Sequence, residues 1–365
     1  MKTRREFLKR STAAGIAGII ASGKAPAYAQ DMGLLKIGQI GIGHNFALQF
    51  RNRERTDGLK LGCKPYGFWY DVHEICERFK TRGFEKVYKD PEELIKESDV
   101  ISIEYPDYGR TLEFAQPALE QGKPVFVDRP FTGTIYSAEK MVELAIANDA
   151  PLMSASSLEL QPELPEIQKW AKDYGPILSY MCYCPEPMFV WMFPHVINFA
   201  HAALGGGINT AYFSGDYIIE MGNIQSERHK KWYDPGRPLG AAVSLLTYKP
   251  RSGEPPIIGM NHIGPGPGPY NIYVYCKEDS KNFVVGEHLD APKIFQPMLV
   301  ALNDFFVNRK LQRPYEALLE QHRALVATNM SRITGRAVKL DSLGGEDALP
   351  YSPSIKDWLD RIYLR

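Results

Sequence analysis

Short apolar runs alternate with stretches of helical period through the first half of the chain. The runs typical of buried strands cover residues 34–40, 68–71, 99–104, 124–128 and 151–154. The stretches with the pattern of helices cover residues 72–81, 111–120 and 137–148, and a short helix begins at Asp90-Pro91. Strands joined by helices of this length predict a parallel sheet with right-handed crossovers.

The second half has apolar segments that are more closely spaced. Segments typical of strands cover residues 176–184, 209–215, 241–247, 257–261, 270–276 and 282–286. Residues 295–308 and 315–334 have the pattern of helices, and the Gly-Pro repeat of residues 264–269 favours neither structure. A chain of 365 residues exceeds one typical domain. We therefore expect one domain over residues 34–155, a second over 156–340, and a C-terminal tail over 341–365.

The first 29 residues have the features of an export signal. Residues 3–9 read Thr-Arg-Arg-Glu-Phe-Leu-Lys, a weakly apolar run covers residues 11–22, and Ala27-Tyr28-Ala29 suits a signal peptidase. This segment resembles a twin-arginine signal peptide, which implies a periplasmic or otherwise exported protein that the twin-arginine translocase carries already folded. The alternative is a membrane anchor, but the run is shorter than the roughly 20 residues that a spanning helix needs. We do not expect an integral membrane protein.

Charge and cysteine content exclude several classes of function. Basic and acidic side chains number 43 each, and removal of the leader would leave an acidic excess of about five. Such a surface gives no electrostatic reason to bind nucleic acid. The five cysteines are an odd number in a long chain, and Cys182 and Cys184 would point to the same face of one strand. We therefore expect buried thiols, with neither a disulfide framework nor a metal site.

A glycine turn follows the first apolar run. Gly41 would allow a tight strand-to-helix turn, and Gly43 would let the backbone approach a pyrophosphate. Gly-x-Gly alone is a weak signal, but this one follows a predicted strand and opens a helix, as a dinucleotide-binding turn requires. Asp71 ends the second strand, where a carboxylate can bind the adenosine ribose and favour NAD(H) over NADP(H). The third position of the pattern is Phe46, a large side chain that should push the helix away from the strand.

Other motifs resemble the Gfo/Idh/MocA oxidoreductases, the glucose–fructose oxidoreductase and inositol dehydrogenase superfamily. The clearest runs from Gln121 to Pro130 and ends in Asp-Arg-Pro, where the family has Glu-Lys-Pro. The resemblance continues at Tyr105-Pro106-Asp107, at His195–Gly205 and at Thr328–Val338. It implies an α/β protein: an N-terminal Rossmann dinucleotide-binding domain and a C-terminal α+β domain with an open, mainly antiparallel sheet. That sheet often pairs between subunits of the family, so a homo-oligomer is expected by analogy.

The resemblance also implies which residues bind the cofactor and the substrate. The expected contacts to NAD(H) are Gly41, Gly43, His44, Asn45, Phe46, Asp71, Tyr105, Pro106, Asp128, Arg129 and Pro130. The implied substrate is a small-molecule sugar or polyol. The expected contacts to it are Arg129, Trp191, His195 and Asn198.

The expected catalytic positions depart from the family pattern. The family has a lysine where this chain has Arg129 and an aspartate where it has Trp191, whereas His195 is retained. Arginine stays protonated in proteins, so Arg129 could orient a hydroxyl or stabilise an oxyanion but could not be the base. His195 could accept the proton, although a structural histidine at a helix start is an alternative. Trp191 could equally be a core residue, and Asn198 a helix-surface residue.

Three functions follow from these observations. The first is an NAD(P)-dependent oxidoreductase that acts on a sugar or polyol CH–OH group, with His195 and Arg129 as its catalytic residues. The second is a redox-neutral lyase, glycosidase or epimerase of the same fold, which would return the hydride to its own product. The third is a non-catalytic carbohydrate-binding or scaffold protein. Export into a compartment with little free NAD would favour a tightly bound cofactor in either enzyme.

Overall fold

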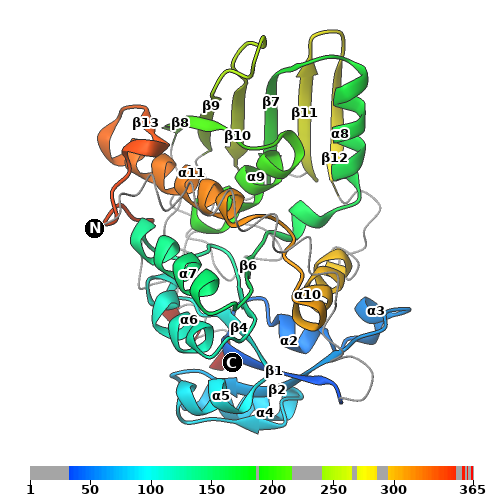
Figure 1. Cartoon of the computed structure of the whole chain (residues 1–365), viewed down its shortest axis with the longest axis vertical. Helices are drawn as coiled ribbons and strands as arrows, with labels where there is room; N and C mark the ends of the chain where they lie inside the picture. Colours follow the sequence, from blue (N-terminus) through cyan, green and yellow to red (C-terminus); the bar gives the residue numbers. More distant parts are fainter. Residues whose placement is uncertain are drawn as a thin grey trace. The chain divides into compact units, whose positions relative to one another are not determined.

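The computed structural model describes residues 33–185, 189–215, 241–264, 269–285 and 295–350, and residues 356, 357, 360, 363 and 364 near the C-terminus. The predicted signal peptide therefore lies outside the described residues. All the helices and strands below belong to one unit, Leu35–Arg365 (Figure 1). This unit contains two β-sheets.

The first sheet is parallel and has six strands, as the hydrophobic pattern predicts. The strands are β1 (Leu35–Gly41), β2 (Cys63–Trp69), β3 (Lys86–Val87), β4 (Val100–Glu104), β5 (Val125–Val127) and β6 (Leu152–Ser154). Their order is β3-β2-β1-β4-β5-β6, which is the order of a Rossmann fold. The strand order reverses between β1 and β4, and folds of this type bind ligands in the crevice outside the carboxyl ends of these two strands.

Helices of unequal length connect these strands. They are α2 (Phe46–Gln49), α3 (Arg53–Thr56), α4 (His73–Arg82), α5 (Pro91–Glu97), α6 (Thr111–Glu120) and α7 (Ile135–Ala147). Helix α5 begins where the sequence predicts, because the Asp90 side chain accepts the N–H of Glu92 and Pro91 stands in the first turn. Helix α2, which follows the glycine turn, has four residues.

The second sheet is open, and most of its neighbouring strands are antiparallel. Its strands are β7 (Ile177–Cys184), β8 (Ile208–Gly215), β9 (Ala242–Tyr248), β10 (Ile258–Ile263), β11 (Tyr270–Cys276), β12 (Ser280–Val285) and β13 (Val338–Lys339). Their order is β12-β11-β7-β10-β9-β8-β13, and β7 pairs with β10 in parallel. The structure confirms the open, mainly antiparallel sheet that the family resemblance implies.

The helices that follow β6 in the described part of the chain are α8 (Glu163–Asp173), α9 (Phe189–Leu204), α10 (Gln296–Asn308) and α11 (Tyr315–Thr334). Helix α10 contacts β2 and α3 of the first half of the chain. Helix α9 contacts β7 and β10, and α11 contacts β8. Helix α9 begins at Phe189 and contains Pro194. Pro194 removes one N–H from the helix, but its fixed φ is compatible with the helical backbone. His195 therefore lies inside the helix and not at its start.

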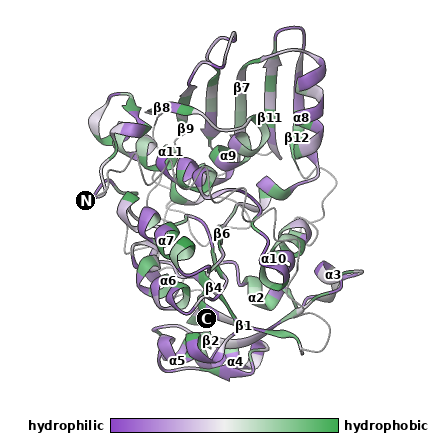
Figure 2. Cartoon of the chain, viewed as in Figure 1, coloured by the Kyte–Doolittle hydropathy of each residue, from purple (hydrophilic) through white to green (hydrophobic). Residues whose placement is uncertain are grey.

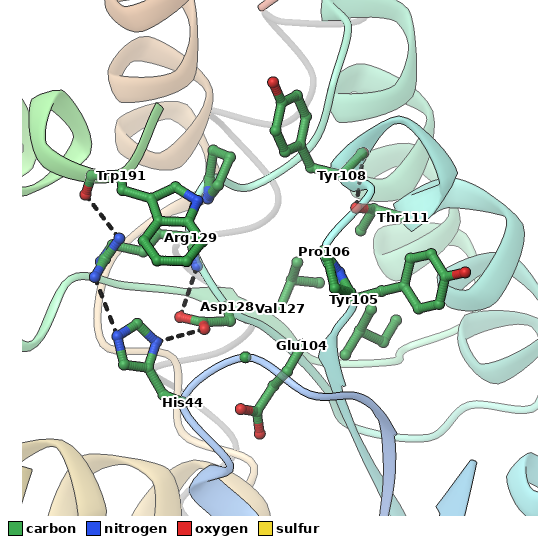
Figure 3. A pocket seen from close by; sticks show the side chains of 13 residues that line it. His44, Glu104, Tyr105, Pro106, Tyr108, Thr111, Val127, Asp128, Arg129 and Trp191 are labelled. Atoms are coloured by element: carbon green, nitrogen blue, oxygen red, sulfur yellow. Dashed lines mark hydrogen bonds and ion pairs between the residues drawn. The ribbon is translucent and has the colours of Figure 1, made fainter. Parts of the chain in front are cut away.

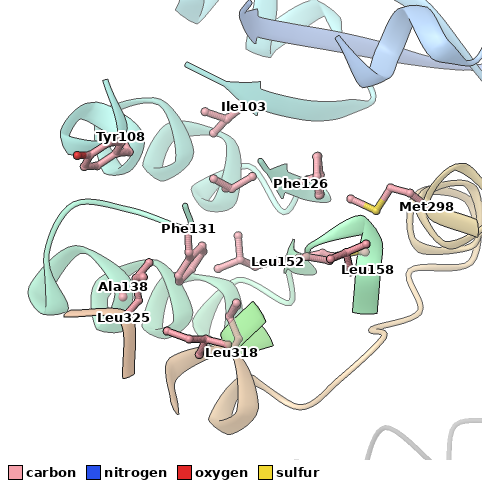
Figure 4. Packing of buried hydrophobic residues seen from close by; sticks show 14 of the residues in the cluster. Ile103, Tyr108, Phe126, Phe131, Ala138, Leu152, Leu158, Met298, Leu318 and Leu325 are labelled. Atoms are coloured by element: carbon pink, nitrogen blue, oxygen red, sulfur yellow. The ribbon is translucent and has the colours of Figure 1, made fainter. Parts of the chain in front are cut away.

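One apolar core joins the first sheet to the C-terminal helices. Ile103 of β4, Phe126 of β5 and Leu152 of β6 belong to the same buried cluster as Met298 of α10 and Leu318 of α11 (Figure 4). The five cysteines are buried, and none of them forms a disulfide bond. Within the described part of the chain, no helix is long and apolar enough to cross a membrane.

The outer face of the second sheet carries a row of apolar side chains. Met181 of β7 pairs with Met260 of β10 and with Tyr273 of β11. The row continues from Met260 to Leu245 of β9 and from there to Tyr212 of β8. Met181 and Met260 are each 38% exposed, and Figure 2 shows hydrophobic residues along these strands. Exposed apolar rows of this kind are typical of protein interfaces, and the homo-oligomer stays a prediction.

Candidate active site

A cavity of about 150 Å³ opens at the carboxyl ends of β1, β4 and β5 (Figure 3). The residues that line it include several of the expected cofactor and substrate contacts, namely Gly43, His44, Tyr105, Pro106, Asp128, Arg129, Pro130 and Trp191. Trp191 comes from α9 and the others from the first sheet and its loops. The structure therefore brings the glycine turn, the Asp-Arg-Pro motif and one helix of the second sheet to a single site.

The two glycines of the turn lie against neighbouring backbone and side chains. Gly41 has a φ of +96°, and a Cβ there would lie 2.5 Å from the backbone oxygen of Glu104. The N–H of Gly43 donates to that oxygen at 2.9 Å, and a Cβ on Gly43 would lie 2.8 Å from Oδ2 of Asp128. Both distances are too short for a real Cβ. Glycine is therefore required for the turn to reach β4 and Asp128.

His44, Asp128 and Arg129 form a hydrogen-bonded group on the cavity wall (Figure 3). Nδ1 of His44 lies 2.6 Å from Oδ2 of Asp128, and Nη2 of Arg129 lies 3.1 Å from Nε2 of His44. Arg129 also donates from Nη1 to the backbone oxygen of Trp191 at 2.7 Å. Because a guanidinium can only donate, Nε2 of His44 is the acceptor and Nδ1 carries the proton that is donated to Asp128.

The Asp128 carboxylate stays charged although it is buried. Burial alone would raise the pKa of Asp128, but the electrostatic interaction and the hydrogen bond with the His44 imidazole, together with the charge of Arg129, lower that pKa below its ordinary value. The other carboxylate oxygen accepts the backbone N–H of Arg129 at 2.8 Å. These contacts fix Asp128 as a hydrogen-bond acceptor for the imidazole.

Glu104, at the end of β4, is a buried acid that the sequence analysis did not single out. Burial, followed by the charge of Asp128, raises the pKa of Glu104 to about 8, so the group is mainly neutral at pH 7. Its Oε1 accepts the N–H of Phe46 and the hydroxyl of Ser102, each at 2.9 Å. Oε2 has no hydrogen-bond partner among the described residues. The carboxyl group points away from Arg129 and Trp191 (Figure 3).

The Phe46 side chain turns away from the cavity. It is buried and meets Phe126 edge to face, with ring centroids 5.5 Å apart, and it also packs near Phe295. The expectation that Phe46 pushes a regular helix away from β1 is replaced by a different arrangement, in which α2 is short and the aromatic ring joins the core. Phe46 does not line the cavity.

Asn45 and Asp71 lie away from the cavity and contact the C-terminal segment. Oδ2 of Asp71 accepts the Tyr105 hydroxyl at 2.7 Å, and the Lys356 ammonium lies 3.4 Å from Oδ1. The side-chain amide of Asn45 donates to the Tyr363 hydroxyl at 2.6 Å. Residues of the C-terminal segment thus lie beside the position that the sequence assigns to the adenosine ribose.

His195 is buried and does not line the cavity. Its Nδ1 lies 2.5 Å from the Ser156 hydroxyl oxygen, which also accepts the backbone N–H of Leu158. Among the described residues, the structure gives the Ser156 hydroxyl proton one acceptor, the imidazole. Nδ1 of His195 is therefore unprotonated and Nε2 carries the proton. Burial, followed by the charge of Arg129, holds the pKa of His195 well below its ordinary value, so the ring is neutral.

Asn198 is part of a buried polar network beside Ser156 and does not line the cavity. Its side-chain amide donates to Oε1 of Glu159 at 3.1 Å, and Glu159 is paired with Arg313 and accepts from Gln321 at 3.0 Å. Asn198 therefore lies in this network and not at the cavity wall. The structure places the predicted substrate contacts Arg129 and Trp191 at the cavity and the other two behind it.

The cavity fits one end of a dinucleotide. Small-molecule sites usually have volumes of about 300–1,000 Å³, so a cavity of about 150 Å³ could hold only part of a dinucleotide. The Asp71 carboxylate has about four acceptor sites and could accept further hydrogen bonds beside Tyr105 and Lys356. The described residues contain no cluster of His, Cys, Asp and Glu side chains that could hold a metal ion.

Comparison with known proteins agrees with this fold. Residues 36–156 match the GFO_IDH_MocA family, described as an oxidoreductase family with an NAD-binding Rossmann fold. The match covers the first sheet and its helices. No curated protein sequence matches the chain.

Solved structures resemble the chain over most of its length. A probable dehydrogenase from Thermotoga maritima has 18% identity and a TM-score of 0.65, over 85% of this chain and 100% of that one. Scyllo-inositol dehydrogenase from Lactobacillus casei, solved with NAD(H) and scyllo-inositol, has 16% identity and a TM-score of 0.65, over 85% and 100%. Myo-inositol 2-dehydrogenase from Lactobacillus plantarum has 17% identity and a TM-score of 0.64, over 84% and 99%. At these identities the likeness shows the fold.

Proposed function

We propose that this protein is an NAD(P)-dependent oxidoreductase that acts on a CH–OH group of a sugar or polyol. The observation that carries the proposal is the cavity in which the Gly43 turn, the Asp128-Arg129-Pro130 motif and Trp191 meet. The family match over residues 36–156 supports the dinucleotide. Structural neighbours that act on inositols support the substrate class.

In this proposal the protein prefers NAD(H) to NADP(H) and binds the cofactor tightly. Asp71 would accept hydrogen bonds from the adenosine ribose and repel a 2′-phosphate. The twin-arginine-like leader supports export of the folded protein, in which a bound cofactor would travel with the chain. Retention of the cofactor also leaves a redox-neutral cycle as the alternative, because such an enzyme would need no exchange of NAD(H).

The residues of the chain have distinct parts in this reaction. When bound, the nicotinamide supplies the hydride acceptor. Arg129 already directs Nη1 and Nη2 to acceptors at the cavity and can donate to the substrate oxygen as it becomes an alkoxide or a carbonyl. The Trp191 ring offers an apolar face on which a sugar ring can stack. His195, protonated on Nε2, can donate a hydrogen bond but cannot accept the hydroxyl proton in this tautomer.

The proposal is tested by asking what the purified full-length protein carries and binds. Mass spectrometry of the denatured protein should show released NAD(H), and fluorescence titration should show binding of added NAD(H). A panel of inositols and hexoses is then tested for nicotinamide reduction, and for turnover without net reduction. A protein that neither releases nor binds NAD(H) or NADP(H) overturns the proposal. Turnover without net NADH identifies the redox-neutral alternative.

A further inference from the structure

We infer that His44, held by Asp128, is the group that exchanges the proton with the substrate. This inference rests on the proposed function, because it concerns the same CH–OH chemistry. From the sequence, His44 is expected to contact the cofactor and His195 to accept the proton. The structure has His44 on the cavity wall and His195 behind it.

The geometry around His44 is that of an oriented base. Asp128 accepts a hydrogen bond from the Nδ1–H group at 2.6 Å, which fixes the tautomer and leaves Nε2 unprotonated. The lone pair of Nε2 accepts from Nη2 of Arg129 at 3.1 Å, and a substrate hydroxyl would take the place of that donor. A carboxylate in this position also stabilises the imidazolium that forms when Nε2 takes a proton. The His44 side chain is 31% exposed and that of Asp128 is 9% exposed. A substrate hydroxyl can therefore approach the imidazole, while the orienting carboxylate is shielded from water.

The other titratable groups near the cavity are unsuited to this step. Arg129 stays protonated and acts as a donor. His195 presents a protonated Nε2 because Ser156 donates to its Nδ1. Glu104 is mainly neutral at pH 7 and points away from Arg129 and Trp191. The charged or titratable groups that face His44 are Asp128 and Arg129 of the β5 end and His195 of α9.

The step balances as an alcohol oxidation. When the substrate C–H bond breaks, a bound nicotinamide would accept the hydride with both of its electrons. The O–H bond breaks and its proton passes to Nε2 of His44, while the C–O bond becomes a carbonyl. Arg129, which lies 3.1 Å from Nε2, is placed to donate to the same oxygen. The imidazolium then loses its proton to water, and reduction follows the reverse path.

The test compares His44→Asn with wild type and with a control, His73→Asn, on the exposed first turn of α4. Asparagine keeps an N–H donor near Asp128 but has no basic nitrogen. We expect the kcat of His44→Asn to be lower than that of wild type by about 10²-fold or more, and the acidic limb of the kcat pH profile to be lost. The Kd for NAD(H) should stay within about threefold of wild type. His73→Asn should match wild type throughout.

A second measurement does not depend on turnover. NMR of nitrogen-labelled histidine in the wild-type protein should show His44 protonated on Nδ1, and Asp128→Asn should disturb that signal. Unchanged kcat in His44→Asn, or a parallel loss of NAD(H) binding and kcat, overturns the inference, and so does an Nε2-protonated His44. If wild type binds no dinucleotide, the proposed function fails, and the tautomer measurement still decides whether His44 is an oriented base.

Discussion

Glu104 should make the stability of the protein fall as pH rises, and Glu104→Gln should remove that dependence. Burial, followed by the charge of Asp128, raises the pKa of Glu104 from 4.5 to about 8. Between these two values the folded chain holds a proton that the unfolded chain has lost. Stability therefore decreases as pH rises through this range, and the loss is complete above the folded pKa.

The size of the effect follows from the width of that range. One pKa unit corresponds to about 1.4 kcal/mol, so a rise from roughly pH 5 to pH 8 removes about 4 kcal/mol. Glutamine keeps an acceptor oxygen for the Phe46 N–H and the Ser102 hydroxyl but cannot ionise. We expect Glu104→Gln to be no more stable than wild type near pH 5 and about 4 kcal/mol more stable near pH 8, a large share of the 5–15 kcal/mol typical of a folded protein.

Urea unfolding followed by tryptophan fluorescence, at several pH values across this range, measures the difference between the two proteins. The matched control is Glu113→Gln on α6, because Glu113 is exposed and its pKa is lowered by its hydrogen bond with Arg110. Its contribution is present above the unfolded pKa and is lost on acidification, so it has the opposite sign. If the stability of Glu104→Gln relative to wild type is the same near pH 5 and near pH 8, Glu104 is not a buried, protonated acid.

Three further predictions concern the cofactor and the second sheet. Gly43→Ala places a Cβ 2.8 Å from Asp128 and should weaken NAD(H) binding about tenfold or more, since close backbone approach is lost; an unchanged Kd contradicts this. Lys356→Ala removes the cation 3.4 Å from Asp71 and should raise the preference for NAD(H) over NADP(H). The increase should be at most about fivefold, which corresponds to the free energy of a solvent-exposed ion pair, and the ratio of the two Kd values measures it. Met181→Asp should give monomers in light scattering if the outer sheet face is the subunit interface, and an unchanged mass would exclude that face.

Some elements of the fold could be predicted from the sequence and others could not. Buried parallel strands are continuous apolar runs, so β1, β4 and β5 stand out in the sequence. Strand β3, Lys86–Val87, escaped because two residues, one of them charged, carry no periodic signal. A helix start at His195 is a natural interpretation of the sequence because proline often marks a boundary, whereas packing against β7 and β10 continues α9 through Pro194.

The location of the site could be predicted from the sequence, but the contacts of its residues could not. The glycine turn and the Asp128-Arg129-Pro130 motif each follow a strand, and parallel topology brings the carboxyl ends of these strands together. The partners of Asn45 and Asp71 come from Tyr363 and Lys356, in the last turns of the chain. Nothing local in the sequence indicates contacts of such long range, because they depend on how the folded elements pack.

Arg129 and His44 are explained together. The family resemblance implies a lysine at position 129, and a lysine can exchange a proton itself, whereas an arginine cannot. A permanent cation at that position instead helps to keep Asp128 ionised, and an ionised Asp128 holds His44 in the tautomer with Nε2 unprotonated. Arg129 also donates to that nitrogen, so the imidazole and the guanidinium would reach the same substrate oxygen, one to take its proton and the other to stabilise the charge. The replacement of the lysine therefore supports the inference that His44, in the glycine turn, exchanges the proton with the substrate.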